Sequence, residues 1–264
     1  MYKVGFIGNI IQVPEYLLQD EDFKLESIIY ESKRLSDELL TFSVVRGIPI
    51  IGIDDNNQLL QIINNQDVNF YVMCSFGRRI SEDVIRTRDI YNIHLSNLPY
   101  YKGRHPTFWA TLNNENKIGI SIHKVEAKID AGDIISQRLI PYYIWMSEID
   151  IFNELITKIP ELLNDLKKHI RGEIAPVKNT PGFYYPIVSE GDITINLEKD
   201  TFRTIFNKVR AQKRYKGARI MLSHNIIWAK NIIFTKSTPC VKNNCKWYHS
   251  LYCVRCPRPF GIIY

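Results

Sequence analysis

Three polar residues, Asn92, His94 and Asp130, stand where the sequence could support acyl transfer to an amine. Asn92 and His94 lie two apart in a predicted strand, residues 90–95, so both side chains point to one face at the carboxyl end of the strand. Ligand sites of parallel sheets form at that end. Asp130 lies in a turn before Gly132, from which a carboxylate can approach an imidazole.

These three side chains match what acylation of an amine requires. The amide of Asn92 can donate a hydrogen bond to the oxyanion of a tetrahedral intermediate. His94 can share that role, or it can accept the proton that the amine loses. Asp130 can hold the imidazole in one tautomer, favour its charged form and relay the proton. None of the three needs to form a covalent bond.

Short apolar segments alternate with amphipathic segments along the first half of the chain. We predict strands at residues 3–7, 25–30, 48–53, 68–74 and 90–95, and helices between them at 12–19, 33–46, 56–65 and 81–88. This order predicts an α/β fold with a Rossmann-like, mostly parallel sheet covered on both faces. Two more strands, 118–126 and 134–140, and one long helix, 147–170, complete the first domain. The first strand ends in Gly5 and Gly8 without the third glycine of a dinucleotide site, which argues against NAD binding.

The chain changes character after a turn-rich connector, residues 178–186. We predict a catalytic domain over residues 1–185 and a small basic α+β domain over 186–264, with a helix from Thr201 and three or four strands. Residues 1–200 hold 21 Lys and Arg against 28 Asp and Glu, whereas residues 201–264 hold 13 basic residues and no acidic one. The net charges are therefore −7 and +13. A basic module predicts an anionic partner, for which nucleotide phosphates, an RNA backbone and an acidic subunit are all candidates.

Composition predicts a soluble, cytoplasmic protein. The 264 residues are 45% hydrophobic, enough for a sizeable core. No stretch approaches the ~18 apolar residues of a membrane span, and the N-terminus lacks a signal-peptide pattern. Five cysteines are too few and too unevenly placed for a disulfide framework, which favours a reducing compartment.

The polar residues lie in a longer pattern, Asn92-Ile-His94-Leu-Ser-Asn-Leu-Pro99-Tyr-Tyr-Lys-Gly103, followed by Ile129-Asp130-Ala-Gly132. It resembles the formyltetrahydrofolate-dependent formyltransferases, which carry an Asn-x-His pair, a Leu-Pro-x-x-x-Gly segment and a Leu-Asp-x-Gly turn. Here Ile129 replaces the leucine. The resemblance implies the catalytic triad Asn92, His94 and Asp130, with N10-formyltetrahydrofolate as the formyl donor. The alternative is that these residues are hydrogen-bonded at a strand end and in a turn without catalysis.

The segment that follows the fourth predicted strand, Cys74-Ser-Phe-Gly-Arg-Arg-Ile80, resembles the loop of this family that holds the pteridine. A flat heteroaromatic ring suits a slot lined by backbone amides and apolar side chains. The resemblance therefore implies a folate pocket lined by Phe76, Gly77, Arg78 and Ile80. The family usually has an apolar residue where this chain has an arginine, and an ordinary loop is the alternative.

The resemblance covers nearly the entire chain, including a short second domain like that of members that formylate nucleotide-linked amino sugars. It implies dTDP-4-amino-4,6-dideoxyglucose as the acceptor, whose formylated form enters surface glycans such as O-antigens. The base and the sugar carbon that bears the amine stay open. Four basic residues are candidate substrate contacts, with solvated charges as the alternative: Lys102, Arg104, Lys208 and Arg210. Trp109, next to Phe108 in a helical pattern, is predicted to lie in the core.

Two other functions compete. A methionyl-tRNA formyltransferase would use the basic module on RNA phosphates, but about 65 residues are short for that enzyme's larger barrel, so nucleic acid is not our predicted partner. A zinc-stapled binding module is suggested by Cys240, Cys245, Cys253 and Cys256, with packed or surface thiols as the alternative. We predict no metal at the catalytic centre. Trp247 and Tyr248 favour pairing with a second copy, so a homodimer is expected.

Overall fold

The computed structural model describes residues 1–222 and 225–232. The chain divides into two compact units. The first is built from Met1–Gly103, Gly119–Ile140 and Glu154–Tyr184, and the second from Arg104–Ile118, Pro141–Asn153 and the described residues from Tyr185 onward. The second unit thus includes two segments that precede residue 185, so the division of the chain into domains at that residue stays a prediction.

A seven-stranded sheet forms the centre of the first unit, in the order β3-β2-β1-β4-β5-β7-β8. The first five strands in that order are parallel, and β7 and β8 are antiparallel to their neighbours. The α/β prediction with a mostly parallel sheet is confirmed. The strands are β1 (Tyr2–Gly8), β2 (Phe23–Glu31), β3 (Ile50–Ile53), β4 (Phe70–Cys74), β5 (Ile90–His94), β7 (Gly119–Lys124) and β8 (Ile134–Leu139).

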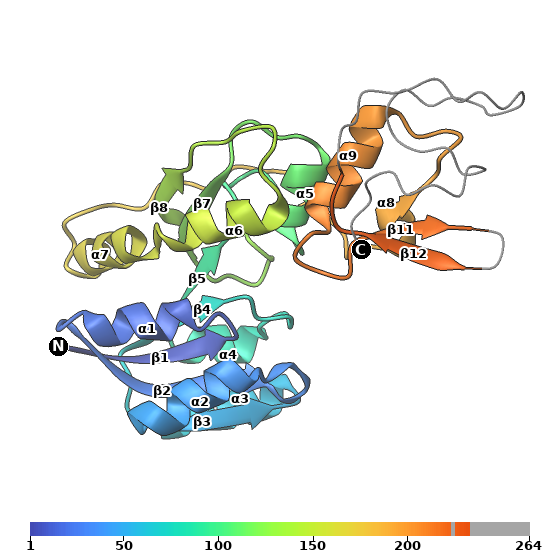
Figure 1. The fold of residues 1–264 in the computed structure, drawn as a ribbon. Helices are drawn as coiled ribbons and strands as arrows, with labels where there is room; N and C mark the ends of the chain where they lie inside the picture. The colour runs from blue at the N-terminus through green and yellow to red at the C-terminus, as the bar shows by residue number, and fades with distance from the viewer. Residues whose placement is uncertain (223–224, 233–264) are drawn as a thin grey trace, which may run out of the picture. The chain divides into compact units, whose positions relative to one another are not determined.

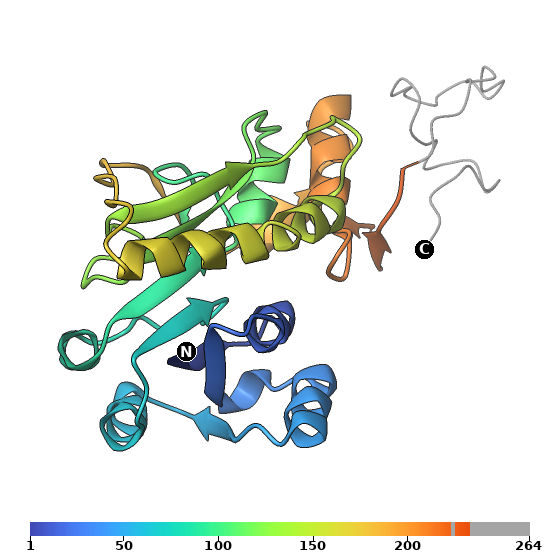
Figure 2. The ribbon, with the colours of Figure 1, turned by 90° about the vertical axis from the view of Figure 1, so that its left-hand side faces the viewer.

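Helices cover both faces of this sheet (Figure 2). They are α1 (Gln12–Gln19), α2 (Asp37–Arg46), α3 (Asn56–Asn65), α4 (Glu82–Thr87) and α7 (Ile159–Ile170), with a short 3₁₀ turn, η1 (Ser32–Arg34). Helices α1 and α7 contact each other, as do α3 and α4. Local chemistry sets several ends: the side chains of Ser36 and Asp55 cap α2 and α3, and Gly47 ends α2 in the left-handed region.

Strands β4 and β5 are buried at every residue. Side chains of α3 and α4, including Leu59, Ile63 and Val84, pack on this part of the sheet together with Tyr71 and Met73 of β4. A close-packed core fixes the positions of the elements that cross it. The loops that leave the ends of β4 and β5 therefore start from well-defined points.

The predicted single helix over residues 147–170 is wrong, because the structure contains two helices there, α6 (Glu148–Ile156) and α7. Pro160 lies in the first turn of α7. Proline is tolerated at that position but breaks a helix interior, since it lacks a backbone N–H. A helical period alone does not reveal such a break.

The second unit contains a small mixed sheet, in the order β10-β11-β12, and helices α5, α8 and α9 (Figure 1). Helix α9 contacts α5 and β11, and the core includes Ile195, Ile205 and Ile220. Thr201 caps α9, so the helix predicted from Thr201 is confirmed. The bounds of the elements in the second unit are α5 (Pro106–Leu112), α8 (Glu190–Ile193), β10 (Thr194–Ile195), α9 (Phe202–Ala211), β11 (Ala218–Met221) and β12 (Ile226–Ala229). The chain also forms two strands of two residues each, β6 (Lys102–Gly103) and β9 (Tyr184–Tyr185).

Several sequence predictions fall outside the residues that the structure describes. These are the strands expected beyond residue 232, the zinc hypothesis for Cys240, Cys245, Cys253 and Cys256, and the aromatic residues Trp247 and Tyr248. Over residues 1–222 and 225–232, no helix is both long enough and apolar enough to cross a bilayer.

Candidate active site

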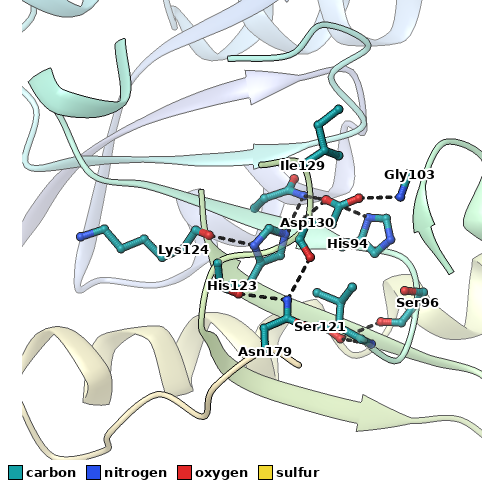
Figure 3. Close-up of polar contacts among 12 residues, drawn as sticks. His94, Ser96, Gly103, Ser121, His123, Lys124, Ile129, Asp130 and Asn179 are labelled. Carbon is teal, nitrogen blue, oxygen red and sulfur yellow. Dashed lines mark hydrogen bonds and ion pairs between the residues drawn. The ribbon is translucent and has the colours of Figure 1, made fainter. Parts of the chain in front are cut away.

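The structure brings together Asn92, His94 and Asp130. Figure 3 shows His94 and Asp130 facing each other. Asn92 and His94 come from β5, and Asp130 comes from the turn between β7 and β8. The His94 Nδ1 atom lies 3.6 Å from Asp130 Oδ1, and Asn92 Nδ2 lies 3.5 Å from the same oxygen. All three residues are buried, with at most 8% of their surface exposed. Strand period and turn position thus predicted this grouping.

The turn itself is shaped around Asp130. The residue has φ 48°, in the left-handed region that L-residues adopt rarely. One carboxylate oxygen, Oδ2, accepts a hydrogen bond of 2.8 Å from the backbone N–H of Gly103. At Gly132 a Cβ would lie 1.9 Å from the carbonyl oxygen of Lys124. The Asp-x-Gly spacing therefore has a steric cause, because only glycine lets the turn lie this close to β7.

A second histidine, His123, belongs to the same group and was not among the predicted site residues. It lies on β7, directly opposite Asn92 in the antiparallel pairing of β5 and β7. Its Nδ1 lies 2.8 Å from the carbonyl oxygen of Lys124, and its Nε2 lies 3.1 Å from Asn92 Nδ2 and 3.5 Å from Asp130 Oδ1. A carbonyl only accepts, so Nδ1 carries a proton. Nε2 accepts from Asn92 when the ring is neutral, and it faces Asp130 as a donor when the ring is protonated. The sequence signal was a polar residue near the end of a buried strand.

The imidazole of His94 is held from two sides. Its Nε2 donates to the carbonyl oxygen of Tyr101 at 2.9 Å, which leaves Nδ1 facing Asp130. The rings of His94 and His123 lie nearly perpendicular, with centroids 6.4 Å apart. One buried carboxylate is therefore flanked by two imidazoles.

The Asn92 amide has no unused donor in this arrangement. Its two N–H bonds are directed at His123 Nε2, at 3.1 Å, and at Asp130 Oδ1, at the longer distance of 3.5 Å. An oxyanion in the site would therefore replace the weaker of these contacts, the one to Asp130. The carboxylate of Asp130 would then lose its contact with Asn92 and would interact more strongly with the two imidazoles.

Electrostatics keep Asp130 ionised. Burial alone raises the pKa of Asp130, but the charges that His94 and His123 carry when protonated, the hydrogen bond of protonated His123 and the Gly103 N–H outweigh burial and hold the pKa well below its ordinary value. An ionised carboxylate stabilises a protonated imidazole beside it. The group can thus accept a proton on an imidazole and supply N–H donors to a developing negative charge.

The predicted folate loop follows β4. Phe76 packs against the buried cluster under α3 and α4, and Ile80 belongs to that cluster. The Gly77 N–H donates to Glu31 Oε2 at 2.8 Å, and Arg78 Nε lies 3.4 Å from Glu31 Oε1. A Cβ at position 77 would lie 2.7 Å from the Glu31 carboxylate. Glu31, which the sequence did not indicate, therefore holds this loop, and folate contacts by Phe76, Gly77, Arg78 and Ile80 stay a prediction.

Lys102 is not the solvent-facing cation that a diphosphate contact would need. Only 2% of its surface is exposed, and its Nζ donates to the carbonyl oxygen of Thr180 at 3.0 Å. Its ammonium lies 5.9 Å from the ring centroid of Tyr184. Desolvation by burial lowers the pKa of Lys102, partly offset by the charge of Asp130. These contacts give Lys102 a structural role, and a substrate contact by Lys102 stays a prediction.

The other three predicted substrate contacts lie in the second unit. Arg104 is exposed. Lys208 Nζ donates to Asp200 Oδ2 at 2.8 Å and to the carbonyl oxygen of Thr194 at 2.6 Å. Arg210 is 4% exposed, and its guanidinium donates to Asn207, Tyr142, Ile144, Met146, Thr111 and Asn114. Lys208 and Arg210 therefore hold this unit together, and a substrate role for them stays a prediction.

Two further expectations concern Trp109 and metal ligands. Trp109 is buried, and its indole N–H donates to the carbonyl oxygen of Pro186 at 3.0 Å, so the prediction that it lies in the core is confirmed. Within the described part of the chain, no three His, Cys, Asp or Glu side chains are grouped as a metal ion would require.

Known proteins similar to this chain include formyltransferases. A family model described as "Formyl transferase" matches residues 54–159, which include Asn92, His94 and Asp130. The methionyl-tRNA formyltransferase of Thermotoga neapolitana is 29% identical over 189 residues, 67% of this chain and 59% of that protein. The chain spans about half to three-fifths of the length of the curated relatives it matches.

Two solved structures show the same fold. One is a 4-N formyltransferase from Francisella tularensis, with a TM-score of 0.70 and 19% identity over 86% of this chain and 95% of that chain. The other is WlaRD, a sugar 3N-formyl transferase crystallised in the presence of dTDP and 5-N-formyl-THF; its TM-score is 0.68, with 22% identity over 90% of this chain and 88% of that chain. At these identities the likeness shows the fold.

Proposed function

We propose that this chain, which a formyl transferase family model matches over residues 54–159, transfers a formyl group from N10-formyltetrahydrofolate to the amine of a nucleotide-linked amino sugar. The observation that carries this proposal is the buried, ionised Asp130 flanked by His94 and His123, with the Asn92 amide beside it. Our specific candidate for the acceptor is dTDP-4-amino-4,6-dideoxyglucose.

The chemistry that we propose is direct transfer. The neutral amine attacks the formyl carbon of the donor, and the carbonyl oxygen becomes an oxyanion, stabilised by Asn92 Nδ2. His94 accepts a proton from the attacking nitrogen while Asp130 stabilises the resulting imidazolium. The bond between the formyl carbon and N10 then breaks, and the proton passes to N10. The products are the formamide and tetrahydrofolate.

Support for a folate donor comes from the family and from the loop after β4. A structural neighbour was determined with a formyl derivative of tetrahydrofolate. In this chain the loop carries the apolar Phe76 and Ile80 and is fixed by Glu31 through Gly77. A fixed loop with apolar side chains suits a flat ring system, since little ordering remains to be done on binding.

Support for a nucleotide-linked sugar comes from the structural neighbours. Those with nearly the same extent as this chain are named as formyltransferases of sugars or of a 4-N position. Because one is a 4-N and another a 3N enzyme, they do not choose the carbon that bears the amine. One neighbour was crystallised with dTDP, which supports that nucleotide as the first to test. A homodimer and a cytoplasmic location stay predictions.

One observation favours a second candidate, methionyl-tRNA as the acceptor. The curated relatives that match over two thirds of this chain are methionyl-tRNA formyltransferases, and residues 201–264 hold 13 basic residues without an acidic one. Binding of tRNA phosphates would weaken steeply with salt, whereas binding of a nucleotide sugar would weaken much less. The salt dependence of KM therefore discriminates between the two acceptors.

The test is a transfer assay with N10-formyltetrahydrofolate and a panel of acceptors, with products identified by mass. The panel contains dTDP-, UDP- and GDP-linked amino sugars with the amine at carbon 3 or 4, and methionyl-tRNA. We expect a new formamide on a dTDP-linked 4-amino sugar. Product with methionyl-tRNA alone would identify the tRNA as the acceptor and would leave the proposed formyl transfer unchanged. No product with any acceptor would contradict the proposal.

A further inference from the structure

Residues 177–184, which we call the strap, follow α7 and run along the turn that carries Asp130. The sequence suggested only a connector between two domains. Val177 and Ile134, at the start of β8, exchange two backbone hydrogen bonds of 2.7 and 2.8 Å. The strap thus begins as an extension of the sheet edge beside the catalytic turn.

Asn179 is the point at which the strap holds this turn. Its side-chain nitrogen donates to the carbonyl oxygen of Asp130 at 2.9 Å and to that of Gly132 at 3.1 Å. Figure 3 shows the Asn179 amide directed at the turn. The residue is 7% exposed, so water has little access to replace these bonds. The two N–H bonds of the Asn179 amide therefore hold the carbonyl groups of Asp130 and Gly132, one on each side of Ala131.

The strap is also held on the carboxyl-terminal side of Asn179. Lys102 Nζ donates to the carbonyl oxygen of Thr180 at 3.0 Å, and the Tyr184 hydroxyl donates to that of Ile129 at 2.8 Å. A Cβ at Gly182 would lie 2.0 Å from the carbonyl oxygen of Pro99, so the strap lies against that backbone. Each of these contacts joins residues more than 50 positions apart in sequence, and together they make the strap a rigid support.

Asp130 needs such a support. Its φ of 48° is unfavourable for a residue with a Cβ, and such conformations persist when surrounding contacts determine them. The carboxylate must also reach the Gly103 N–H and both imidazoles from this one backbone position. Small displacements of a catalytic group cost large factors in rate. The orientation of the turn is therefore as important for function as the carboxylate itself.

We propose that Asn179 is a positioning residue for the catalytic carboxylate: it holds the Asp130 turn in the conformation that places Asp130 between His94 and His123. Its effect on rate rests on the proposed formyl transfer. Its effect on the turn does not depend on the reaction, because the Gly103 N–H reports directly on the position of Asp130 Oδ2.

The test uses Asn179→Ala in the full chain, with Asn179→Ser as a milder variant that folds if the alanine variant does not. Tyr184→Phe is the matched control, because it removes another strap hydrogen bond, to Ile129, and leaves the carbonyl of Asp130 bound. The first readout is hydrogen exchange at the Gly103 amide, with the buried Leu98 amide, which donates to Ser121 Oγ, as internal reference. We expect Gly103 to exchange at least about tenfold faster in Asn179→Ala, and Leu98 to be unchanged.

The second readout is kinetic. In Asn179→Ala we expect kcat to fall about 30-fold with KM for both substrates within about twofold, and Tyr184→Phe to change kcat less than about twofold. In an Asp130→Asn background, Asn179→Ala should lower kcat by less than a further factor of about two, since Asn179 acts through Asp130. Equal losses in both backgrounds, or unchanged exchange at Gly103, would overturn the proposal. If the wild-type protein transfers no formyl group, the proposed function fails, and the exchange experiment still decides the role of Asn179.

Discussion

Asp130 in the first unit and Arg210 in the second are both buried charges, yet their surroundings differ in kind. Arg210 donates hydrogen bonds of 2.8 to 3.1 Å to six uncharged acceptors, four of them in the segments that join α5 to α6. Asp130 accepts one short bond, of 2.8 Å from Gly103, and its other partners lie at 3.5 to 3.6 Å.

The difference separates a structural charge from a reactive one. A buried group whose donors are all bound at short distance stabilises the fold and has nothing left for a ligand. The contacts of Asp130 with the two imidazoles are longer, and the imidazoles can gain or lose protons. Such contacts can shorten when substrates bind. Residue type and charge do not reveal this difference in the sequence, in which Arg210 is one of four candidate substrate contacts, and that role stays a prediction.

His94→Ala should show the largest effect on the reactive side of this comparison. Removing the proton acceptor beside Asp130 is expected to lower kcat about 10³-fold, ~4 kcal/mol of transition-state stabilisation. Thermal unfolding of the variant should remain cooperative, although the buried ring and its contact with the carbonyl oxygen of Tyr101 are lost. Steady-state kinetics and thermal unfolding of the same preparation measure both. A kcat within tenfold of the parent would show that another group accepts the proton.

Asn92→Ala should have a smaller effect on the same centre. Loss of an oxyanion donor is expected to lower kcat about 10²-fold, ~3 kcal/mol, with a smaller rise in KM. The split between kcat and KM distinguishes a donor used in the transition state from one that binds substrate. A large rise in KM with kcat preserved would assign Asn92 to binding the ground state.

Arg210→Met tests the structural side of the comparison. The substitution keeps an apolar stem but removes the guanidinium donors to the carbonyl oxygens of Ile144 and Met146, so we expect a loss of about 3 kcal/mol in the free energy of unfolding. Urea unfolding measures it, and Arg210→Lys is the control that retains a donor. Unchanged stability together with a raised KM for the acceptor would restore the substrate role.

Acid should remove the stabilisation that comes from Asp130. The folded-state pKa of Asp130 lies below its unfolded value of about 3.9. Its contribution is therefore fully present above that value and is lost as the pH falls through the folded pKa. From pH 6 toward pH 3, the stability of the parent should fall relative to Asp130→Asn by on the order of 1 kcal/mol. Urea unfolding of both proteins at each pH measures this difference. The same difference in the free energy of unfolding at every pH would contradict this assignment.

Local patterns predicted much of the fold and part of the site. Strand and helix periods placed β1 to β5 and α1 to α4, and the two-residue spacing placed Asn92 and His94 on one face. The break before α7 was missed, because the period continues through Pro160. The sequence therefore indicates elements and faces more reliably than where one helix stops and the next begins.

The missed residues depend on which elements become neighbours. His123 joins the site because β7 pairs antiparallel with β5, and Asn179 joins it because the strap lies on the turn. Glu31 reaches Gly77 across 46 positions from the end of β2. A single sequence gives the side chains that could take part in such contacts, but not the long-range packing that selects among them.

The measurement that tests the central claim most directly compares the parent with Asp130→Asn in a single-turnover transfer from N10-formyltetrahydrofolate to a dTDP-linked 4-amino sugar, at equal concentrations of folded protein. We predict a formamide product from the parent and a rate at least about 10³-fold lower from Asp130→Asn, with folate binding retained in both. Equal rates from the two proteins would contradict the assignment of Asp130 and its imidazoles as the reactive centre.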